Sequence, residues 1–386
     1  MPTYPIKLYS KSSVERDWKC PRSYYWAYEY DGKGIQSQSY GLELMLGSAI
    51  HDALAVLALK TKAGEAIDID LIATTAYQQV FDSLPKPEDS TPLDLTKVEF
   101  AKEQATLIEG LIRGFYKHVW PKLMAKYRIA SVELPTIHRH GRNLGMVAKP
   151  DLILQDQGDD SLWYYEYKTT SSKKDEWIKS WEYAIQLHSS IRAVEQTTGN
   201  SIDGVIIQGL YKGYRSYDKQ GSPFCYAYKK NGNPPFTKDQ IAYEYKSGFF
   251  RVPTWELEGG VKGWVESMPS NVLADQFPQT APIFVNDFLI DAFFKQQELR
   301  QRDIVAVSEY LRGGEGTPEG IQEAINDVFP QRFDQCRPSF GYECPYLKLC
   351  HSNAGENPLE NGFVYRTLDH MQDFLDLLTP EERGNA

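Results

Sequence analysis

Three ionisable residues stand out because they interrupt a stretch that otherwise has the pattern of β-structure. Asp151 follows Val-Ala-Lys-Pro, and Glu166 and Lys168 end the segment Trp-Tyr-Tyr-Glu-Tyr-Lys. Apolar and aromatic residues fill both arms of residues 147–168, and the turn-forming residues 156–160 separate them, so we predict a β-hairpin. Side chains two positions apart on a strand share a face. Glu166 and Lys168 are therefore expected to project together.

The chemistry of these groups points to a metal ion and an activated water molecule. Asp151, on the neighbouring arm, is expected to face the same point as Glu166. Two carboxylates supply the oxygen ligands that a hard divalent cation prefers, and a lysine beside them can position or deprotonate water. Glu133, on a strand expected at residues 129–137, is either a further carboxylate of this site or a solvated residue on the polar face of its strand.

The elements around the hairpin follow from hydrophobic periodicity. A serine cap precedes a short helix near residue 10, and Gly47-Ser48 is expected to open a helix that carries His51 one turn inside. A single histidine on a helix is more often structural than a ligand. Further helices are expected at residues 65–84, 95–127 and 283–312, and further strands at 203–214, 223–229 and 248–255.

A helix is also expected directly after the hairpin, and it carries Gln186 in its middle. A glutamine there has functional meaning only if the helix packs on the hairpin. Lys173, Lys174 and Lys179 precede this position, and either belong to a solvated surface or contact phosphate.

Length and charge limit the classes of function. A chain of 386 residues suffices for one large domain or two ordinary ones. The net charge of −10 argues against broad nonspecific adhesion to nucleic acid, but it does not exclude an enzyme with one basic channel. No apolar run approaches the roughly 18 residues that span a bilayer. With no signal-peptide pattern at the N-terminus, a cytoplasmic location is expected.

The five cysteines are unevenly distributed. Cys336, Cys344 and Cys350 have the spacing C-x7-C-x5-C near the C-terminus, whereas Cys20 lies near the N-terminus. Three thiolates need a fourth ligand to complete a tetrahedral zinc site or a four-iron cluster. That ligand is Cys20, which like Cys344 precedes a proline, or His351, which would give a local Cys3His zinc site. Thiols without a metal remain the alternative, and Cys225 is expected to be a plain buried thiol.

Taken together, the order of these motifs resembles the PD-(D/E)xK nuclease superfamily. The nearest resemblance is to its RecB-like branch with an iron–sulfur cluster, which includes AddB-type and CRISPR-adaptation exonucleases and related phage proteins. The resemblance covers about residues 8–195 and 333–352. Its motifs are Cys20-Pro-Arg22-Ser-Tyr24, Gly47-Ser-Ala-Ile-His51, Lys149-Pro150-Asp151, Glu166-Tyr-Lys168, Gln186 and the three C-terminal cysteines.

The resemblance implies roles for these residues. Asp151, Glu166 and the Tyr167 carbonyl would bind Mg²⁺ or Mn²⁺, with His51 as a further ligand. Lys168 would position or activate the attacking water, and Gln186 would orient Lys168 or contact DNA. A [4Fe–4S] cluster held by four cysteines would join the two chain ends; structural Zn²⁺ is the alternative. These cysteines are Cys20, Cys336, Cys344 and Cys350.

The resemblance also implies a fold and a function. The expected fold is α/β and restriction-endonuclease-like, a central mixed β-sheet flanked by helices. We expect a single nuclease domain with a core at about 8–195, a β-rich accessory insertion at about 200–330 and a cluster-binding segment at about 331–352. The implied activity is a metal-dependent DNase, most simply an exonuclease acting on single- or double-stranded DNA ends in repair, recombination or phage DNA processing. The alternative is a non-catalytic module that binds DNA ends or a recombination partner.

Two features depart from the family pattern. Ser190 stands where the family's helix motif commonly has a tyrosine four residues after the glutamine, and the cysteine trio begins C-x7-C instead of a closer spacing. The chain also has no G-x4-G-K-[ST] motif, so a helicase or recombinase partner would have to supply any unwinding.

Overall fold

The fold is described from a computed structural model of the chain. The described residues are 6–37, 42–82, 92–141, 143–170, 172, 174–182, 184–211, 225–229, 243–244, 249–253, 261, 265, 274–313, 316–337, 343–352, 357–367 and 371–383.

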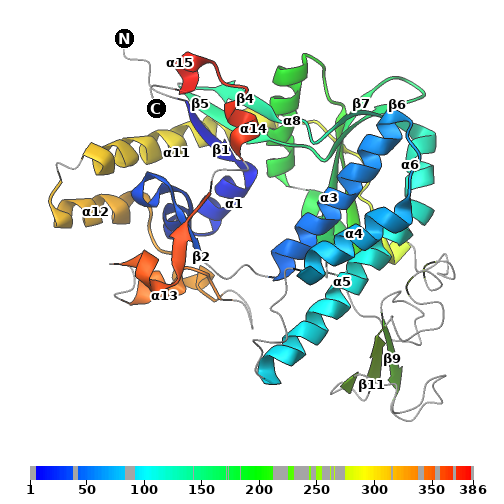
Figure 1. Cartoon of the computed structure of the whole chain (residues 1–386). Coiled ribbons are helices and arrows are strands. Elements are labelled where there is room, and N and C mark those ends of the chain that lie inside the picture. Colours follow the sequence, from blue (N-terminus) through cyan, green and yellow to red (C-terminus); the bar gives the residue numbers. More distant parts are fainter. Residues whose placement is uncertain are drawn as a thin grey trace.

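A five-stranded mixed sheet forms the centre of the molecule (Figure 1). Its strand order is β12 (Ile283–Phe284), β8 (Gly204–Tyr211), β7 (Leu162–Thr170), β6 (Leu152–Asp156) and β3 (Tyr127–Val132). β7 and β8 run parallel, and the other neighbouring strands are antiparallel. Helices cover both sides, so the expected α/β fold with a central mixed sheet is confirmed.

The two faces of β7 pack against different helices, because successive side chains of a strand point to opposite faces. Tyr165 and Tyr167 are fully buried against helices α3 (Leu42–Ala63), α4 (Ile69–Asp82), α5 (Pro92–His118) and α6 (Trp120–Lys126). On the other face, Tyr164 packs against α7 (Lys174–Glu182) and α8 (Ile185–Thr198). Since Glu166 and Lys168 follow the register of Tyr164, they belong to the face that α7 and α8 cover.

A second sheet continues from the first through a short link. It contains β1 (Lys7–Ser10), β5 (Leu144–Ala148) and β4 (Thr136–His140), with β5 in the middle. Helix α11 (Asp287–Gly313) packs on this sheet through Phe293 and Phe294, and α14 (Gln372–Leu375) packs on its other side through Phe374. Helix α1 (Lys11–Lys19) follows β1 directly, with Ser10 and Ser13 forming its capping box.

The two ends of the chain share one hydrophobic core, and Figure 1 shows them side by side at the left of the molecule. Strand β2 (Ile35–Ser37) pairs with β13 (Phe363–Tyr365), and Arg22 donates to the carbonyl of Phe329 at 2.9 Å. The core joins α2 (Pro21–Tyr24) and the π-helical turn η1 (Tyr25–Glu29) to α12 (Pro318–Val328) and α13 (Leu347–His351). The remaining elements are η2 (Tyr30–Gly32), β9 (Cys225–Lys229), β10 (Tyr243–Glu244), β11 (Phe249–Pro253), η7 (Phe333–Gln335), η9 (Pro358–Asn361) and α15 (Pro380–Arg383).

Several expected boundaries differ from the structure. The first arm of the hairpin begins at Leu152, not at residue 147, because Pro150 cannot donate to a strand ladder. The expected strand 129–137 is two strands, β3 and β4, which separate at Glu133 with its positive φ of 44°. Helix α3 begins at Leu42, before Gly47-Ser48, because residues 42–46 are strong helix formers.

The region after residue 195 contributes to the core. β8, within the strand expected at residues 203–214, pairs with β7 along eight residues, so the central sheet extends into the region expected to be an accessory insertion. α11 and α12 make much of the rest of that region helical. The expected strands at 223–229 and 248–255 are confirmed as β9 and β11, which pair antiparallel in a small separate sheet.

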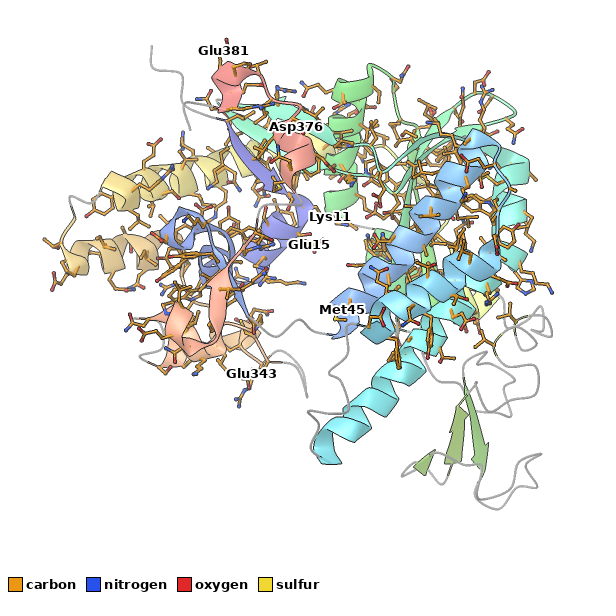
Figure 2. All side chains as sticks on the ribbon, in the orientation of Figure 1. Lys11, Glu15, Met45, Glu343, Asp376 and Glu381 are labelled. Atoms are coloured by element: carbon orange, nitrogen blue, oxygen red, sulfur yellow. The ribbon has the colours of Figure 1, made fainter. Side chains whose placement is uncertain are left out.

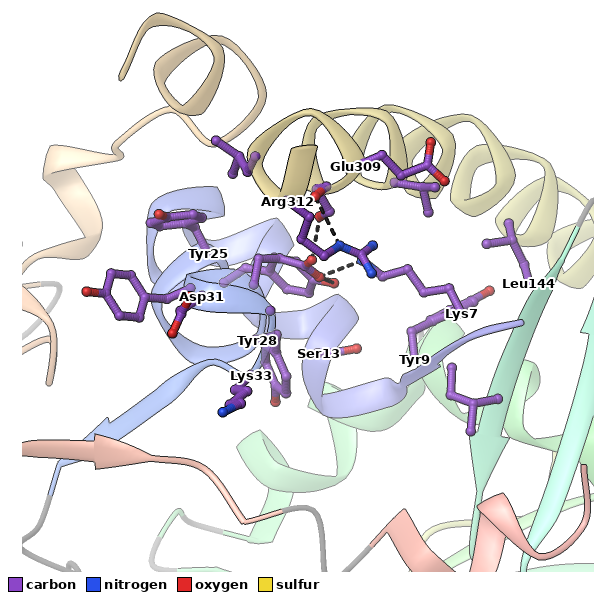
Figure 3. Close-up of a pocket in the computed structure, with 18 of the residues that line it drawn as sticks. Lys7, Tyr9, Ser13, Tyr25, Tyr28, Asp31, Lys33, Leu144, Glu309 and Arg312 are labelled. Carbon is purple, nitrogen blue, oxygen red and sulfur yellow. Dashed lines mark hydrogen bonds and ion pairs between the residues drawn. The ribbon is translucent and has the colours of Figure 1, made fainter. Parts of the chain in front are cut away.

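A cavity of about 1420 Å³ lies between α1, the turns that follow it and α11 (Figure 3). At its wall the buried carboxylate of Glu29 accepts hydrogen bonds from Lys7 (2.6 Å), Tyr24 (2.9 Å) and Ser308 (2.6 Å). These three donors come from β1, α2 and α11, so we interpret Glu29 as a structural tie between chain segments. Of the described helices, none combines the length and apolar character that a membrane crossing requires.

Two half-buried histidines that pack on α11 predict how stability depends on pH. Burial lowers the pKa of His138 and of His140 to about 4, and both rings pack on Phe294. The unfolded chain therefore binds two protons between about pH 6.5 and pH 4 that the folded chain does not bind. Their contribution to stability is complete above about pH 6.5 and is lost as the pH falls towards 4.

We predict that the free energy of unfolding in urea decreases between pH 7 and pH 5. The double variant His138→Gln/His140→Gln should show a weaker pH dependence over this interval, because Gln does not titrate. Equal pH dependence in the two proteins would contradict the assignment.

Candidate active site

Asp151 directly precedes β6, and its side chain continues the hydrogen bonding between β6 and β7 past the first residue of β6. Its Oδ2 accepts the backbone N–H of Tyr167 at 2.6 Å, and its carbonyl accepts the N–H of Glu133 at 3.0 Å. Asp151 thus lies in the link between β5 and β6, not on the hairpin arm where the sequence analysis expected it. The carboxylate nevertheless meets β7 next to Glu166, because Tyr167 anchors it there.

Helix α3 brings His51 to the same carboxylate. His51 Nδ1 lies 2.9 Å from Asp151 Oδ1, and its ring makes an edge contact with Tyr167 at 6.2 Å between centroids. The packing of α3 on the Tyr165 and Tyr167 face of the sheet fixes this position. A histidine that the sequence alone could assign to the core therefore lies beside the carboxylate of Asp151.

Glu166 and Lys168 project together, as expected from their spacing. Lys168 Nζ donates to Glu166 Oε1, whereas Glu166 Oε2 is buried and has no hydrogen-bond partner among the described residues. The hydroxyl of Tyr164 lies near Glu166 and Ser190, and burial with the charge of Glu166 raises its pKa well above the usual value. Ser190 is thus a buried neighbour of a phenol that β7 supplies.

The acidic and basic groups of the site stabilise one another's charged forms and so shift one another's pKa values. Burial lowers the pKa of His51 and of Lys168, but the carboxylates of Asp151 and Glu166 outweigh burial and raise both values. Burial alone would raise the pKa of Asp151, yet His51 and Lys168 hold it below its usual value. At neutral pH the carboxylate is therefore ionised and His51 is held towards its protonated form.

The basic side chains of the site are more exposed than the acidic ones. The side chains of Asp151 and Glu166 are each 12% exposed, whereas those of His51 and Lys168 are 27% and 28% exposed. The basic groups are thus partly exposed, and more so than the acidic groups. An anionic ligand would find more of the basic side chains than of the acidic ones accessible.

Two other residues were predicted for this site, Glu133 and Gln186. Glu133 Oε2 lies 3.2 Å from Lys149 Nζ, so Glu133 forms an ion pair of its own. Gln186 lies in the first turn of α8, not in the middle of a helix, because α8 begins at Ile185. Its side chain, like that of Cys225, lies outside the described residues.

Lys11 and Glu15 of α1 reach the site but were missed in the sequence analysis. Burial lowers the pKa of Lys11, and the charges of Lys168, Glu166 and Asp151 also act on its ammonium group. Glu15 lies 4.0 Å from Lys11 on the same face of α1, where Figure 2 shows the two side chains next to each other. The serine-capped helix start was visible in the sequence, but the pairing of β1 with β5 is what places α1 beside the hairpin.

The donors suit a hard divalent ion in chemical type. Asp151 and Glu166 offer carboxylate oxygens, Glu166 Oε2 is a buried acceptor without a described partner, and His51 offers a nitrogen. Within the described part of the chain, however, no three His, Cys, Asp or Glu side chains come close enough together to hold a metal ion. Lys168 contacts only Oε1 of Glu166, so Oε2 stays available as a ligand.

The four predicted cluster cysteines lie near one another where the chain ends meet. Cys20 is buried, and all four are free thiols. Burial raises the pKa of Cys344 and, to about 11, that of Cys350; Cys20 also acts on both through its charge. Cys336 Sγ lies 3.6 Å from His351 Nε2, so both alternative fourth ligands are close to the trio. As at the carboxylates, no described group of three is close enough to coordinate a metal.

The family of the chain follows from sequence comparison. A sequence model of the PD-(D/E)XK nuclease superfamily matches residues 9–351, which include His51, Asp151, Glu166 and Lys168. The chain belongs to the PD-(D/E)XK nuclease superfamily. No curated protein matches the chain.

Metal binding at the carboxylates predicts a thermal shift. We expect millimolar MnCl₂ or MgCl₂ to raise the melting temperature of the protein by a few degrees, because a ligand that binds only the folded state stabilises it. Asp151→Asn keeps the size of the side chain but removes a charged oxygen donor, so the shift should disappear. Asp373→Asn, on the far side of Lys149, is the matched control and should keep it. Equal shifts in both variants would contradict metal binding at Asp151.

Proposed function

We propose that this protein is a metal-dependent DNA exonuclease. Membership in the nuclease superfamily indicates metal-dependent phosphodiester hydrolysis with DNA as substrate. The observation that carries the assignment of residues is the cluster of Asp151, Glu166, Lys168 and His51 at the open end of the hairpin. The preference for DNA ends rests on the resemblance to exonucleases of the RecB-like branch.

The proposed roles follow from the position of each group. Asp151, Glu166, His51 and the Tyr167 carbonyl would hold a Mg²⁺ or Mn²⁺ ion, which lowers the pKa of bound water and polarises the phosphate. Lys168, the more exposed partner of the buried Glu166, would orient the attacking water and stabilise negative charge on the phosphate as it develops. Gln186, at the start of α8, would orient Lys168 or contact DNA. The hydroxyl of Tyr164, which lies near both Glu166 and Ser190, would help to hold Glu166 in place.

Cleavage assays test the catalytic assignment. Asp151→Asn and Lys168→Gln should each lower the rate of Mn²⁺-dependent nucleotide release by at least about a hundredfold, since each removes a charge that acts in the transition state. Lys60→Ala, an exposed lysine on α3 paired with Glu65, is the control and should retain the wild-type rate. Retained activity in both site variants would refute these roles. A folded wild-type protein that binds DNA ends without cleaving them would favour the non-catalytic end-binding module.

The mode of attack is tested by end-labelled DNA. A time course with single- and double-stranded substrates, each labelled at one end, distinguishes stepwise release from an end from internal cuts. Circular DNA that is degraded as fast as linear DNA would overturn the exonuclease proposal.

We further propose that Cys20, Cys336, Cys344 and Cys350 hold a [4Fe–4S] cluster, with structural zinc as the alternative. The grouping of the four thiols at the junction of the chain ends supports a structural role, since the bound group would join segments that already share a core. A thiol must lose its proton to bind a metal, and bound metal would offset the raised pKa of Cys344 and Cys350.

Spectroscopy distinguishes the two cofactors. Protein purified without oxygen should be brown, with absorbance near roughly 400 nm and about four iron atoms per chain. Cys344→Ser should lose the colour and melt at a lower temperature, whereas Cys225→Ser should keep both properties. Colourless protein with one zinc ion would establish the alternative, and metal-free protein would overturn both.

We propose a single nuclease domain that acts in the cytoplasm in DNA repair, recombination or phage DNA processing. Because the sequence lacks a helicase P-loop, a partner helicase or recombinase would supply single-stranded ends.

A further inference from the structure

A second cavity lies between α1 and α7, beside the proposed active site. Its volume is about 410 Å³, within the range of roughly 300–1,000 Å³ typical of ligand sites. Trp18 and Trp181 supply indole rings to its wall, and Lys19 and Arg332 supply positive charge. Arg332 precedes the cysteine-bearing segment, so the N-terminal helix, the helix after the hairpin and the C-terminal region all contribute.

The cations of this cavity are available to a ligand. Lys19 and Arg332 are exposed, and neither forms an ion pair with another residue that the structure describes. The indole N–H of Trp181 is buried and has no hydrogen-bond acceptor among the described residues. The wall therefore combines the exposed charges of Lys19 and Arg332 with aromatic surface, and Glu15 adds one carboxylate.

Lys11 connects this cavity to the carboxylates. Its ammonium lies 5.3 Å from the centre of the Trp181 ring and 4.0 Å from Glu15, and both of these residues line the cavity. The side chain is only 19% exposed, and it also lies within range of the charges of Lys168 and Glu166. A buried cation between two sites is suited to an anionic group that extends from one to the other.

We propose that the cavity between Trp18 and Trp181 binds one unpaired nucleotide of the DNA strand, and that Lys11 binds the phosphate joining it to the scissile position. The inference rests on the proposed function for its substrate and adds the recognition of single-stranded DNA. Proteins bind single strands with aromatic side chains that stack on the bases and with cations that contact the phosphates. Stacking is possible for every base, because every base has a flat face. A base in a duplex is already stacked and paired, so only an unpaired base can enter.

Binding in EDTA tests the proposal without cleavage. Fluorescence anisotropy would compare a labelled oligo-dT with oligo-dT that carries one abasic residue, placed at each position in turn. Trp181→Leu should weaken binding of intact oligo-dT about tenfold, which is within the range for one stacked base. At one position the abasic residue should weaken binding to the wild type but not to Trp181→Leu. A purely structural role of Trp181 would not remove this base dependence.

A second variant keeps the test independent of the packing of Trp181. We place the other phosphate of the bound nucleotide at the exposed guanidinium of Arg332, which lines the cavity. Arg332→Ala should therefore lower the slope of log affinity against log salt concentration by about 0.7, the value for one phosphate contact on a single strand. Arg337→Ala is the matched control, because this exposed arginine lies in the same segment and pairs with Glu343 at 2.8 Å. Thermal melts of each variant establish that it is folded.

The outcomes separate this inference from the proposed function. Equal abasic penalties in wild type and Trp181→Leu, or equal salt slopes in Arg332→Ala and Arg337→Ala, would overturn the nucleotide site even if the protein cleaves DNA. Binding of dTMP as tight as that of oligo-dT would identify a site for the released product and would also overturn the proposal. The predicted binding pattern in a protein that never cleaves DNA would uphold the site and overturn the nuclease assignment.

Discussion

The arrangement of the site depends on the carboxylate of Asp151, which binds two parts of the fold at once. One oxygen accepts the N–H of Tyr167 on β7, and the other meets the ring of His51 on α3. The backbone of Asp151 adds a third link, because its carbonyl pairs with Glu133. Pro150, directly before it, has no N–H to donate to a strand ladder, and the Asp151 side chain accepts the N–H of Tyr167 next to the start of β6.

The same carboxylate balances the charges around it. Buried charges are costly unless they are paired, and loss of one partner from a buried pair is strongly destabilising. Here each largely buried carboxylate has a more exposed basic neighbour. A site built in this way would leave the basic groups accessible to a phosphodiester while shielding the carboxylate oxygens that are proposed to bind a metal ion.

The packing of the chain ends affects the site as well as stability. β1 pairs with β5, and α1 follows β1 directly, so that Lys11 of α1 lies over the ring of Trp181 on α7. The same N-terminal segment packs on α12 and α13, and Arg332 and Gln335, which directly precede Cys336, line the Trp18–Trp181 cavity. A cofactor bound by the cysteines would therefore stabilise one wall of the path proposed for DNA.

The sequence by itself determined the hairpin, the shared face of Glu166 and Lys168, and most of the helices. These features depend on alternation, periodicity and turn chemistry, which act over a few residues and are visible in any one segment. The match to the nuclease family confirmed the class that the motif order had indicated. Local patterns gave a wrong helix start at Gly47-Ser48, because the helix formers before it extend the helix to Leu42. They also gave a wrong strand start at residue 147, because the strand begins only after Pro150, at Leu152.

Only the tertiary structure decided which isolated residues meet. His51 is 100 positions from Asp151, and Lys11 is farther still, so no local pattern joins them to the hairpin. The partner of Glu133 was equally open, and the fold pairs its carboxylate with Lys149. β8 joins the core sheet through parallel pairing, which needs a crossover helix and leaves no short-range signal of its partner. Such contacts arise from the packing of whole elements, and for that reason they appear only when the chain is folded.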